Sequence, residues 1–305
     1  MRLYVHPNRP EGNHDVTRLY KSTWWRGLRD WRSYRHIETY CMFLGYPRSG
    51  HSLVGALLDA HPNIAISQEA DALGYMAAGF QRRQLYALMM IRATEFAAAG
   101  WQWQGYNYAV PNQWQGRVKT LKVIGDKKGG LSTEWLATRP ELLEQLRSLV
   151  RVPVKLIHVV RNPFDNIATI FTRKHRPSLE EAAEWYFSLC STVSRVVKEN
   201  PGDIMTVHHE DLIANPVEQL HSLVRFLGQE CTEQYLRDCA GIVFCSPKQT
   251  RHLVQWPASL RERVERDIAR HEFLQCYSFG SPQTPAAQTS HRSNPARRYV
   301  TSQPL

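Results

Sequence analysis

Residues 40–60 read YCMFLGYPRSGHSLVGALLDA, and this stretch decides the fold. Its first five residues are apolar without alternation, which predicts a strand covered on both faces, and Ser52–Ala60 predicts a helix. The loop between them, Gly45–Ser52, has the spacing G-x-x-x-x-G-x-S, close to the phosphate-binding pattern G-x-x-x-x-G-K-[ST]. Its glycines permit positive φ and close approach of the backbone, and the free N–H groups at a helix start favour an anion. The stretch therefore predicts a strand, a phosphate-binding loop and a helix in succession.

One position of the loop departs from the nucleotide-hydrolysing pattern. His51 stands where nucleoside triphosphatases carry a lysine that contacts the β- and γ-phosphates. No strand that ends in a Mg²⁺-binding aspartate is evident elsewhere in the sequence. The loop is therefore better suited to a phosphate than to Mg²⁺-dependent hydrolysis of a triphosphate.

Short apolar runs and helix-like stretches alternate along the rest of the chain. Further strands are predicted at residues 64–66, 118–124, 154–160 and 204–207. Further helices are predicted at residues 72–98, 140–150, 163–174, 179–198, 216–227 and 260–271. This alternation predicts an α/β protein with three layers and a central parallel sheet. In such folds ligands bind where the loops leave the carboxyl ends of the strands.

A second loop of interest follows the strand predicted at 154–160. Arg161 ends that strand, and Asn162 and Pro163 suit the N-cap and first position of the next helix. Thr169 lies about two turns into the helix, so a guanidinium and a hydroxyl could converge on a second phosphate. A well-capped junction with an incidental arginine is the alternative interpretation.

Composition narrows the class of protein. The chain has 305 residues, of which 43% are hydrophobic and 22% charged, and no apolar run approaches the ~18 residues of a membrane-spanning helix. Its six cysteines form no C-x-x-C pair, which argues against a zinc site and suits a reducing compartment. The first 30 residues lack the apolar core of a secretory signal, so we expect a cytoplasmic protein.

The net charge of +10 is concentrated toward the two ends. Residues 1–40 hold eight Lys and Arg against four Asp and Glu, and residues 281–305 hold three against none. A nucleic-acid-binding domain would carry its excess on one face of its core, so we expect no nucleic acid partner. We predict a basic aromatic N-terminal arm at 1–38, one domain at 39–280 and a disordered tail at 281–305.

The N-terminal arm contains a basic amphipathic pattern at residues 24–35. Trp24, Leu28 and Trp31 fall on one helical stripe, and arginines occupy most of the positions between them. Such a helix can make weak contact with an anionic membrane surface. Packing of the stripe against the domain is the simpler alternative.

The two loops together resemble those of the sulfotransferases that use 3′-phosphoadenosine-5′-phosphosulfate (PAPS). The resemblance covers roughly residues 39–280 and implies a P-loop-NTPase-like version of the three-layer fold. It implies that the first loop binds the 5′-phosphosulfate end of the donor, and that Arg161 and Thr169 bind its 3′-phosphate. The residues of the first loop that this concerns are Pro47, Arg48, Ser49, Gly50, His51 and Ser52.

The residues after the first loop resemble tyrosylprotein sulfotransferases and their bacterial relatives. The sequence LLDAHPNI at 57–64 is followed by Glu69, which the resemblance makes the catalytic base. Lys127 matches a lysine that contacts the transferring sulfonate in the family. The Lys-Thr-His segment of the cytosolic aryl and steroid enzymes is broken, because Leu121 stands at the histidine position. His51 remains the alternative base.

The resemblance implies in-line transfer of a sulfonate to an acceptor hydroxyl without a metal. Arg48, Lys127 and the loop N–H groups would stabilise the charge, while Glu69 removes the proton. The acceptor class left open is a small molecule, a carbohydrate or a lipid headgroup. Lys248 and Arg251 lie in a basic segment that the resemblance places over the 3′-phosphate, with a solvated loop as the alternative.

The segment 100–116, GWQWQGYNYAVPNQWQG, mixes aromatic rings with side-chain amides. This mixture suits a sugar or aromatic acceptor, although a packed excursion over the core has the same composition. Two other functions stay open at this stage. One is a P-loop kinase or NTPase-like protein, which Mg²⁺-ATP binding would indicate, and the other is a non-catalytic binding module.

Overall fold

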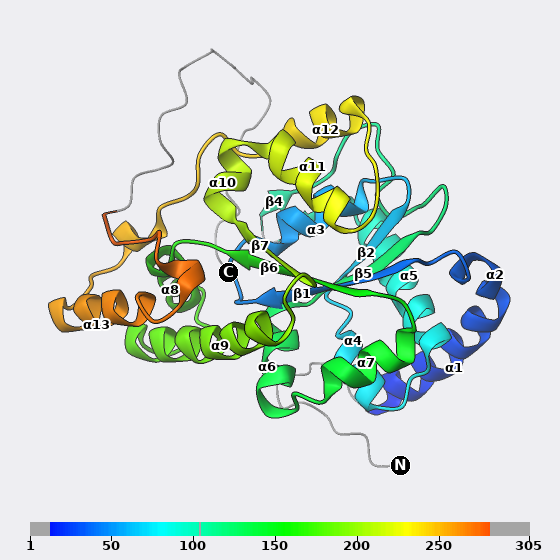
Figure 1. Cartoon of the computed structure of the whole chain (residues 1–305), viewed down its shortest axis with the longest axis horizontal. Helices are drawn as coiled ribbons and strands as arrows, with labels where there is room; N and C mark the ends of the chain where they lie inside the picture. Colours follow the sequence, from blue (N-terminus) through cyan, green and yellow to red (C-terminus); the bar gives the residue numbers. More distant parts are fainter. Residues whose placement is uncertain (1–12, 104, 281–305) are drawn as a thin grey trace.

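A computed structural model of the chain describes residues 13–103 and 105–280. At its centre lies a five-stranded parallel sheet with the strand order β2-β5-β1-β6-β7 (Figure 1). Its strands in chain order are β1 (Thr39–Gly45), β2 (Ile64–Gln68), β5 (Val123–Lys127), β6 (Val154–Val160) and β7 (Ile204–His208). A separate antiparallel hairpin is formed by β3 (Gln102–Trp103) and β4 (Tyr106–Asn107).

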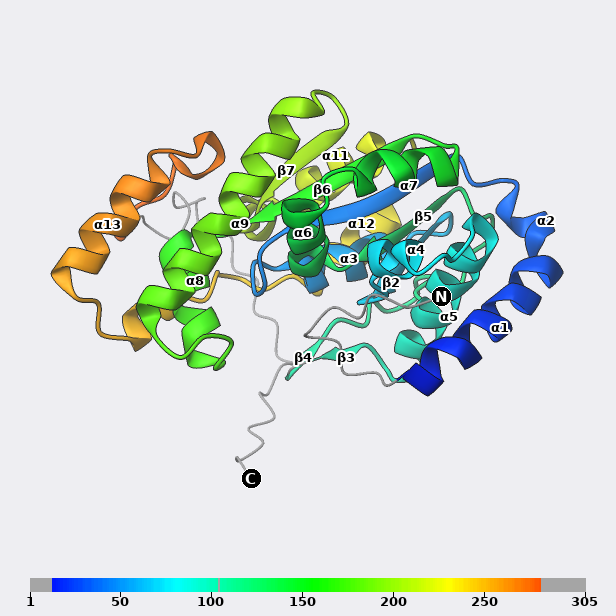
Figure 2. The same cartoon turned by 90° about the horizontal axis from the view of Figure 1, so that it is seen from below.

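Helices cover both faces of this sheet, as the two perpendicular views show (Figures 1 and 2). Those that precede β6 are α1 (Asn13–Arg29), α2 (Trp31–Tyr34), α3 (His51–Asp59), α4 (Ala72–Ala77), α5 (Arg82–Ala98), α6 (Gly129–Thr138) and α7 (Leu142–Val150). Those that follow it are α8 (Pro163–Thr172), α9 (Leu179–Glu199), α10 (His209–Ala214), α11 (Pro216–Phe226), α12 (Glu233–Ala240) and α13 (Ala258–Ile268). Two short 3₁₀ helices are η1 (Thr250–Leu253) and η2 (Glu272–Leu274).

Strand β1 shows why the sheet is the middle of three layers. Every one of its residues is buried. Tyr40 and Met42 belong to the core that includes residues of α5 and α7, whereas Cys41 and Phe43 belong to the core that includes residues of α3 and α11. Successive side chains of a strand point to opposite faces, so an unbroken apolar run is what a doubly covered strand requires. The three-layer α/β prediction is confirmed.

Two predicted elements differ from the structure. The predicted helix 72–98 is two helices, because the chain turns at Gly79 with φ of 91° and Gln81 then caps α5. The strand predicted at 118–124 is displaced to β5, since Lys119 and Lys122 instead donate backbone hydrogen bonds to the 62–63 turn. The displacement makes Lys127 the last residue of its strand.

The part of the chain before residue 39 contains α1 and α2, and α1 packs along α5. The tail predicted at 281–305 lies outside the described residues. Within the described ranges, none of the helices combines the length and the apolar character needed to cross a bilayer.

Candidate active site

The predicted site residues gather where the parallel strands end. Glu69 follows β2, Lys127 ends β5, Gly45 ends β1 and Arg161 follows β6. Strand β1 pairs with β5 on one side and with β6 on the other, where Gly45 lies opposite Val159. Since neighbouring strands run about 4.8 Å apart, these groups form a row across one edge of the sheet. The order along the row is carboxylate, ammonium, phosphate-type loop and guanidinium.

The loop between β1 and α3 is held in shape by side chains from other helices. Asn166 of α8 donates to the Pro47 carbonyl at 2.8 Å, and the hydroxyl of Thr133 in α6 accepts from the Gly45 N–H at 2.9 Å. Arg48 has a positive φ of 73°, a conformation that costs energy for a side chain other than glycine. The loop backbone is therefore preorganised, which is the condition for effective anion binding by N–H groups.

Gly50 lies against a histidine that the sequence did not connect with the loop. Its φ is 106°, and a Cβ placed there would lie 2.5 Å from Nδ1 of His209. That Nδ1 atom is buried and makes no hydrogen bond. Burial, with Arg161 nearby, lowers the pKa of His209 to about 3, so its ring is neutral at pH 7. His209 begins α10 after β7, and only the fold brings it beside residue 50.

Glu69 is joined to two lysines at the end of β5. Its Oε1 accepts from Lys127 at 2.5 Å, and its Oε2 lies 2.7 Å from the ammonium of Lys128. Lys127 is almost completely buried and also donates to the Ser52 hydroxyl of the loop at 3.1 Å. The ammonium of Lys127 therefore bridges the candidate base and the phosphate-type loop.

The two lysines decide the charge of Glu69. Burial alone would raise the pKa of this carboxyl group, but the positive charges of Lys127 and Lys128 outweigh it and lower the pKa to about 2. Glu69 also has a positive φ of 57°, an uncommon backbone conformation that is often found at functional positions. The sequence indicated Lys127, whereas Lys128 was not singled out.

A buried aspartate fixes the turn that carries Glu69. Asp126 accepts backbone hydrogen bonds from Ala70 at 3.0 Å and from Ala72 at 2.9 Å. The Ser67 hydroxyl donates to the same carboxylate at 3.1 Å. Asp126 lies one residue before Lys127 on β5, so one strand end holds both the turn and the lysine. In the sequence, only its position directly before Lys127 pointed to a role for Asp126 at this strand end.

The predicted second phosphate site brings Arg161 and Thr169 together. Arg161 is buried, and its Nη1 lies 3.5 Å from the Thr169 hydroxyl. Its Nη2 donates to the Lys248 carbonyl and lies 3.4 Å from the Thr250 hydroxyl, while its buried Nε makes no hydrogen bond. Burial lowers the pKa of Arg161, and the nearby carboxylate of Asp165 opposes that effect. An anion at this place would find a guanidinium and two hydroxyl groups.

The basic segment that contains η1 is anchored to this site in two different ways. Arg251 forms a buried ion pair with Asp165 of α8 at 2.6 Å, and its backbone N–H donates to the same carboxylate at 2.8 Å. Lys248 is exposed, and its carbonyl accepts the hydrogen bond of Arg161. The Arg251 side chain thus has a carboxylate partner within the fold.

Residues 42–233 match a family model described as the sulfotransferase family. The chain belongs to that family. The match spans both loops and the Glu69–Lys127 pair, and the protein is a sulfotransferase enzyme rather than a kinase or a non-catalytic module.

Solved structures of sulfotransferases are similar to this one in fold. The sulfotransferase domain of the Synechococcus PCC 7002 olefin synthase is 15% identical and aligns over 76% of this chain and 94% of its own, with a TM-score of 0.47. The sulfotransferase domain from the curacin biosynthetic pathway is 15% identical over 77% and 98%, with a TM-score of 0.48. A sulfotransferase from Alicyclobacillus acidocaldarius is 16% identical over 78% and 96%, with a TM-score of 0.43. No curated protein matched the chain.

In this sulfotransferase His51 lies behind the loop. Its Nε2 is 2.9 Å from the Leu44 carbonyl, and a Cβ on Gly129 would lie 2.3 Å from the ring. Burial lowers the pKa of His51 to about 4, so at pH 7 the neutral ring donates Nε2–H to that carbonyl. The hydrogen bond ties the start of α3 to the end of β1. This geometry favours a loop-stabilising residue, and the role of His51 as a base stays a prediction.

Two tyrosines of the aromatic segment 100–116 act electrostatically on Arg48 of the first loop. Burial and the nearby charge of Arg173 lower the pKa of Arg48, and Tyr108 and Tyr106 partly oppose that effect. Tyr106 also influences the pKa of Arg161, and its ring lies 5.5 Å from that of Phe244. The assignment of this segment to acceptor specificity stays a prediction.

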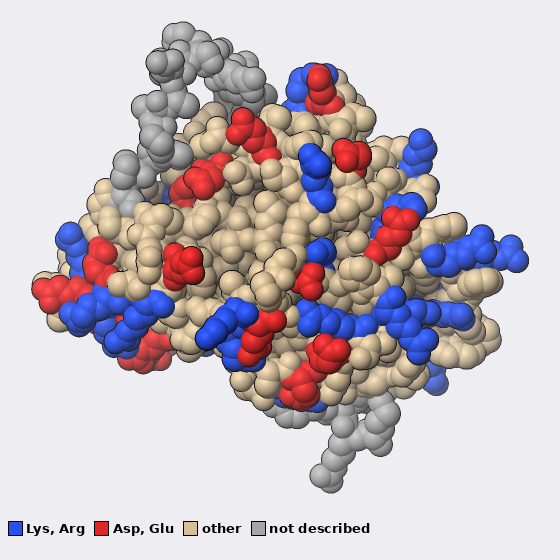
Figure 3. All heavy atoms as spheres, in the orientation of Figure 1, with Lys and Arg blue, Asp and Glu red and all other residues tan. Residues whose placement is uncertain are grey.

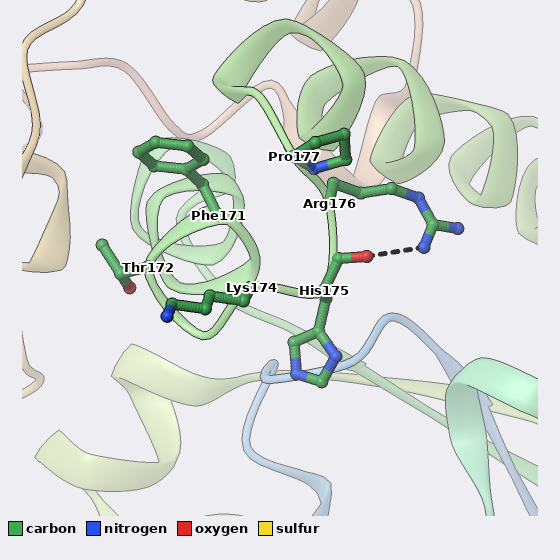
Figure 4. Close-up of a pocket in the computed structure, with 6 residues that line it drawn as sticks. All are labelled: Phe171, Thr172, Lys174, His175, Arg176 and Pro177. Atoms are coloured by element: carbon green, nitrogen blue, oxygen red, sulfur yellow. Dashed lines mark hydrogen bonds between the residues drawn. The ribbon is translucent and has the colours of Figure 1, made fainter. Parts of the chain in front are cut away.

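A hollow of about 570 Å³ opens at the end of α8 (Figure 4). It is lined by Phe171, Thr172, Lys174, His175, Arg176 and Pro177. Burial and the positive charges of Arg48, Arg176 and Arg173 lower the pKa of His175. Among the residues that the structure describes, no group of three or more His, Cys, Asp or Glu is arranged to hold a metal ion.

Proposed function

We propose that this sulfotransferase transfers the sulfonate of PAPS to an acceptor hydroxyl, with Glu69 as the base. The main support is the order of the charged groups and loops along the edge of the sheet. Two anion-binding loops follow adjacent strands, β1 and β6, and the Lys127–Glu69 pair follows β5 and β2 on the other side of the loop. A donor with phosphate groups at both ends would span the two loops and present its sulfonate toward the pair.

The residues present fit such a nucleotide. The first loop offers preorganised N–H groups and the Arg48 guanidinium, and the second offers Thr169 and Arg161, whose Nε is buried without a hydrogen-bond partner. Buried donors without partners are costly, so a bound anion would repay the strain of keeping Arg161 there. When bound, PAPS supplies an activated sulfonate whose leaving group is a phosphate.

Lys127 couples donor binding to the base. Its ammonium contacts both Ser52 of the loop and Glu69, so it lies between the sulfonate position and the carboxylate. When Lys127 turns toward an anion on the loop, Glu69 loses its closest positive charge. The pKa of Glu69 then rises from about 2 and the carboxylate becomes a stronger base. In this arrangement an anion held by the loop and Lys127 would raise the basicity of Glu69 toward the acceptor hydroxyl.

Donor binding is tested by thermal unfolding with 3′,5′-adenosine bisphosphate in parallel with Mg²⁺-ATP. A ligand at 100 times its Kd adds about 2.7 kcal/mol of stability, which corresponds to a rise in Tm of several degrees. We expect this rise with the bisphosphate, its loss in Arg161→Ala, and its retention in the exposed control Arg225→Ala. A rise with Mg²⁺-ATP alone would refute the proposed donor.

The base is tested by the rate of sulfonate transfer from labelled PAPS across a panel of hydroxyl acceptors. We expect Glu69→Gln to lower kcat by about 10²–10⁴-fold, because general-base catalysis contributes about that factor. The bisphosphate should still bind, since the variant keeps both anion-binding loops. Glu218→Gln, on the exposed part of α11, is the matched control. Normal turnover in Glu69→Gln would assign the base elsewhere.

A further inference from the structure

Helix α1 uses one face to join the domain. Thr23 is fully buried, and Tyr20 packs its ring 5.1 Å from Phe80. A Cβ on Gly27 would lie 2.9 Å from the backbone oxygen of Arg83, so α1 and α5 are in close contact there. One face of α1 is thus attached to α5 and to Phe80 through these contacts.

The outward face of α1 and α2 carries large apolar side chains. Trp25 is 66% exposed and Trp24 is 45% exposed, with their rings 4.9 Å apart. Leu28 and Trp31 are 39% and 40% exposed. Of the seven large hydrophobic side chains exposed in the described part of the chain, these are four. A patch of this kind usually marks an interaction site rather than ordinary surface.

Positive charge surrounds this aromatic patch. Between residues 17 and 35 the chain has six basic side chains, and all of them are exposed: Arg18, Lys21, Arg26, Arg29, Arg32 and Arg35. The same stretch has one acidic residue, Asp30, which is paired with Arg29 at 2.7 Å. Figure 3 shows Lys and Arg atoms gathered at the right-hand edge, where Figure 1 places α1 and α2.

We propose that α1 and α2 dock the enzyme on an anionic lipid bilayer. Tryptophan rings prefer the boundary between headgroups and acyl chains, and the flanking arginines match the negative charge of the headgroups. A second copy of this chain fits the patch less well, because each copy would bring six basic groups against six of the other. The positive charge around the patch therefore favours binding to an anionic lipid surface over dimerisation.

The test is co-sedimentation of the full chain with vesicles. Phosphatidylcholine vesicles are compared with vesicles that also contain phosphatidylglycerol. We expect binding to the anionic vesicles alone, weakened by high salt because the screening length shortens. The double variant Trp24→Ala, Trp25→Ala should bind at least about tenfold more weakly, since it removes two apolar side chains that enter the interface. The variant should remain folded, with a Tm within a few degrees of that of the original chain, because neither side chain lies in the core.

A charge series separates specific docking from general attraction. The triple variant Arg26→Gln, Arg29→Gln, Arg32→Gln should bind about a hundredfold more weakly, from about fivefold for each basic residue near the surface. The same charge change on α13 and just after its end, at the opposite end of the molecule from α1 in Figures 1 and 2, is the control: Arg261→Gln, Arg266→Gln, Arg270→Gln.

Three results would overturn the proposal. They are absence of binding to anionic vesicles, equal losses in the α1–α2 and α13 variants, or a dimer in sedimentation that the double tryptophan variant converts to monomer. The last result would assign the patch to a second copy.

Discussion

At the scale of single residues, the ion pairs with Lys127 and Lys128 allow the ionised carboxylate of Glu69 to stabilise the folded state. The group has a pKa of about 2 in the folded chain, below the 4.5 of a free glutamate side chain. A depressed pKa means that the ionised carboxylate stabilises the folded state at pH values above about 4.5. That contribution is lost as the pH falls toward 2.

The pH dependence of Glu69→Gln follows from this shift. The variant leaves Lys127 and Lys128 without their carboxylate, so we expect it to be less stable than the original chain at pH 7. The difference in Tm should narrow between about pH 5 and pH 3, as the original chain loses its advantage by protonation. Thermal melts across this range measure it, with Glu218→Gln as the control. A difference that stays constant with pH would show that the ion pairs do not govern the charge of Glu69.

At the scale of elements, the turn from β1 into α3 depends on Gly50 for two separable reasons. An alanine at position 50 would have to adopt the unfavourable φ of 106°, and its Cβ would clash with the ring of His209. Gly202→Ala provides the matched control, because Gly202 has a φ of 85° with nothing within 4 Å of its Cβ position. We expect Gly202→Ala to cost about 1–2 kcal/mol of unfolding free energy from the backbone alone.

Gly50→Ala should cost more than Gly202→Ala and should also abolish binding of the bisphosphate. Urea unfolding and the thermal shift measure the two effects. Adding His209→Ala to Gly50→Ala should recover the part of the stability that the clash removes. If the two glycine variants were equally destabilised and both bound the nucleotide, close packing of His209 on the loop would be refuted.

The junction between η1 and α8 rests on the buried Arg251–Asp165 pair. Removing one member of a buried ion pair costs about 3–5 kcal/mol, because the other charge is left without a partner. We therefore expect Arg251→Gln and Asp165→Asn to lower the unfolding free energy by about this amount, measured by urea denaturation. The double variant should cost less than the two single variants added. A stable Arg251→Gln that simply binds the bisphosphate weakly would instead make Arg251 a phosphate contact.

Local patterns were enough to predict the loop after β1, Arg161 with Thr169, and the layers of the sheet. Each depends on the order of nearby residues along the chain, such as an apolar strand followed by glycines. Two other contacts could not be predicted from local patterns, because their residues are far apart in the sequence. They are the packing of His209 on Gly50 and the ion pair of Arg251 with Asp165. The split between α4 and α5 was missed because the glycine turn lies inside a continuous helix-favouring stretch.

At the scale of the whole molecule, the two loops proposed to bind the donor should respond to one ligand together. Hydrogen exchange with and without the bisphosphate measures this. We expect slower exchange of amides in 45–52 and, through Arg161, in η1, because one nucleotide would contact both loops. Amides of α12 and α13 should exchange at unchanged rates. Protection confined to 45–52 would mean that the second loop does not bind the same ligand.

The central position of β1 has a consequence for synthesis of the chain. Gly45 at its end pairs with Val159, and at about 5–20 residues per second the ribosome needs roughly 6–23 s to pass from one to the other. During that interval the apolar strand has no β6 partner, and the half of the proposed donor site that follows β6 has not been made. During synthesis the β6 edge of this apolar strand therefore stays unpaired until residue 160 has been added, and an unpaired strand edge favours aggregation.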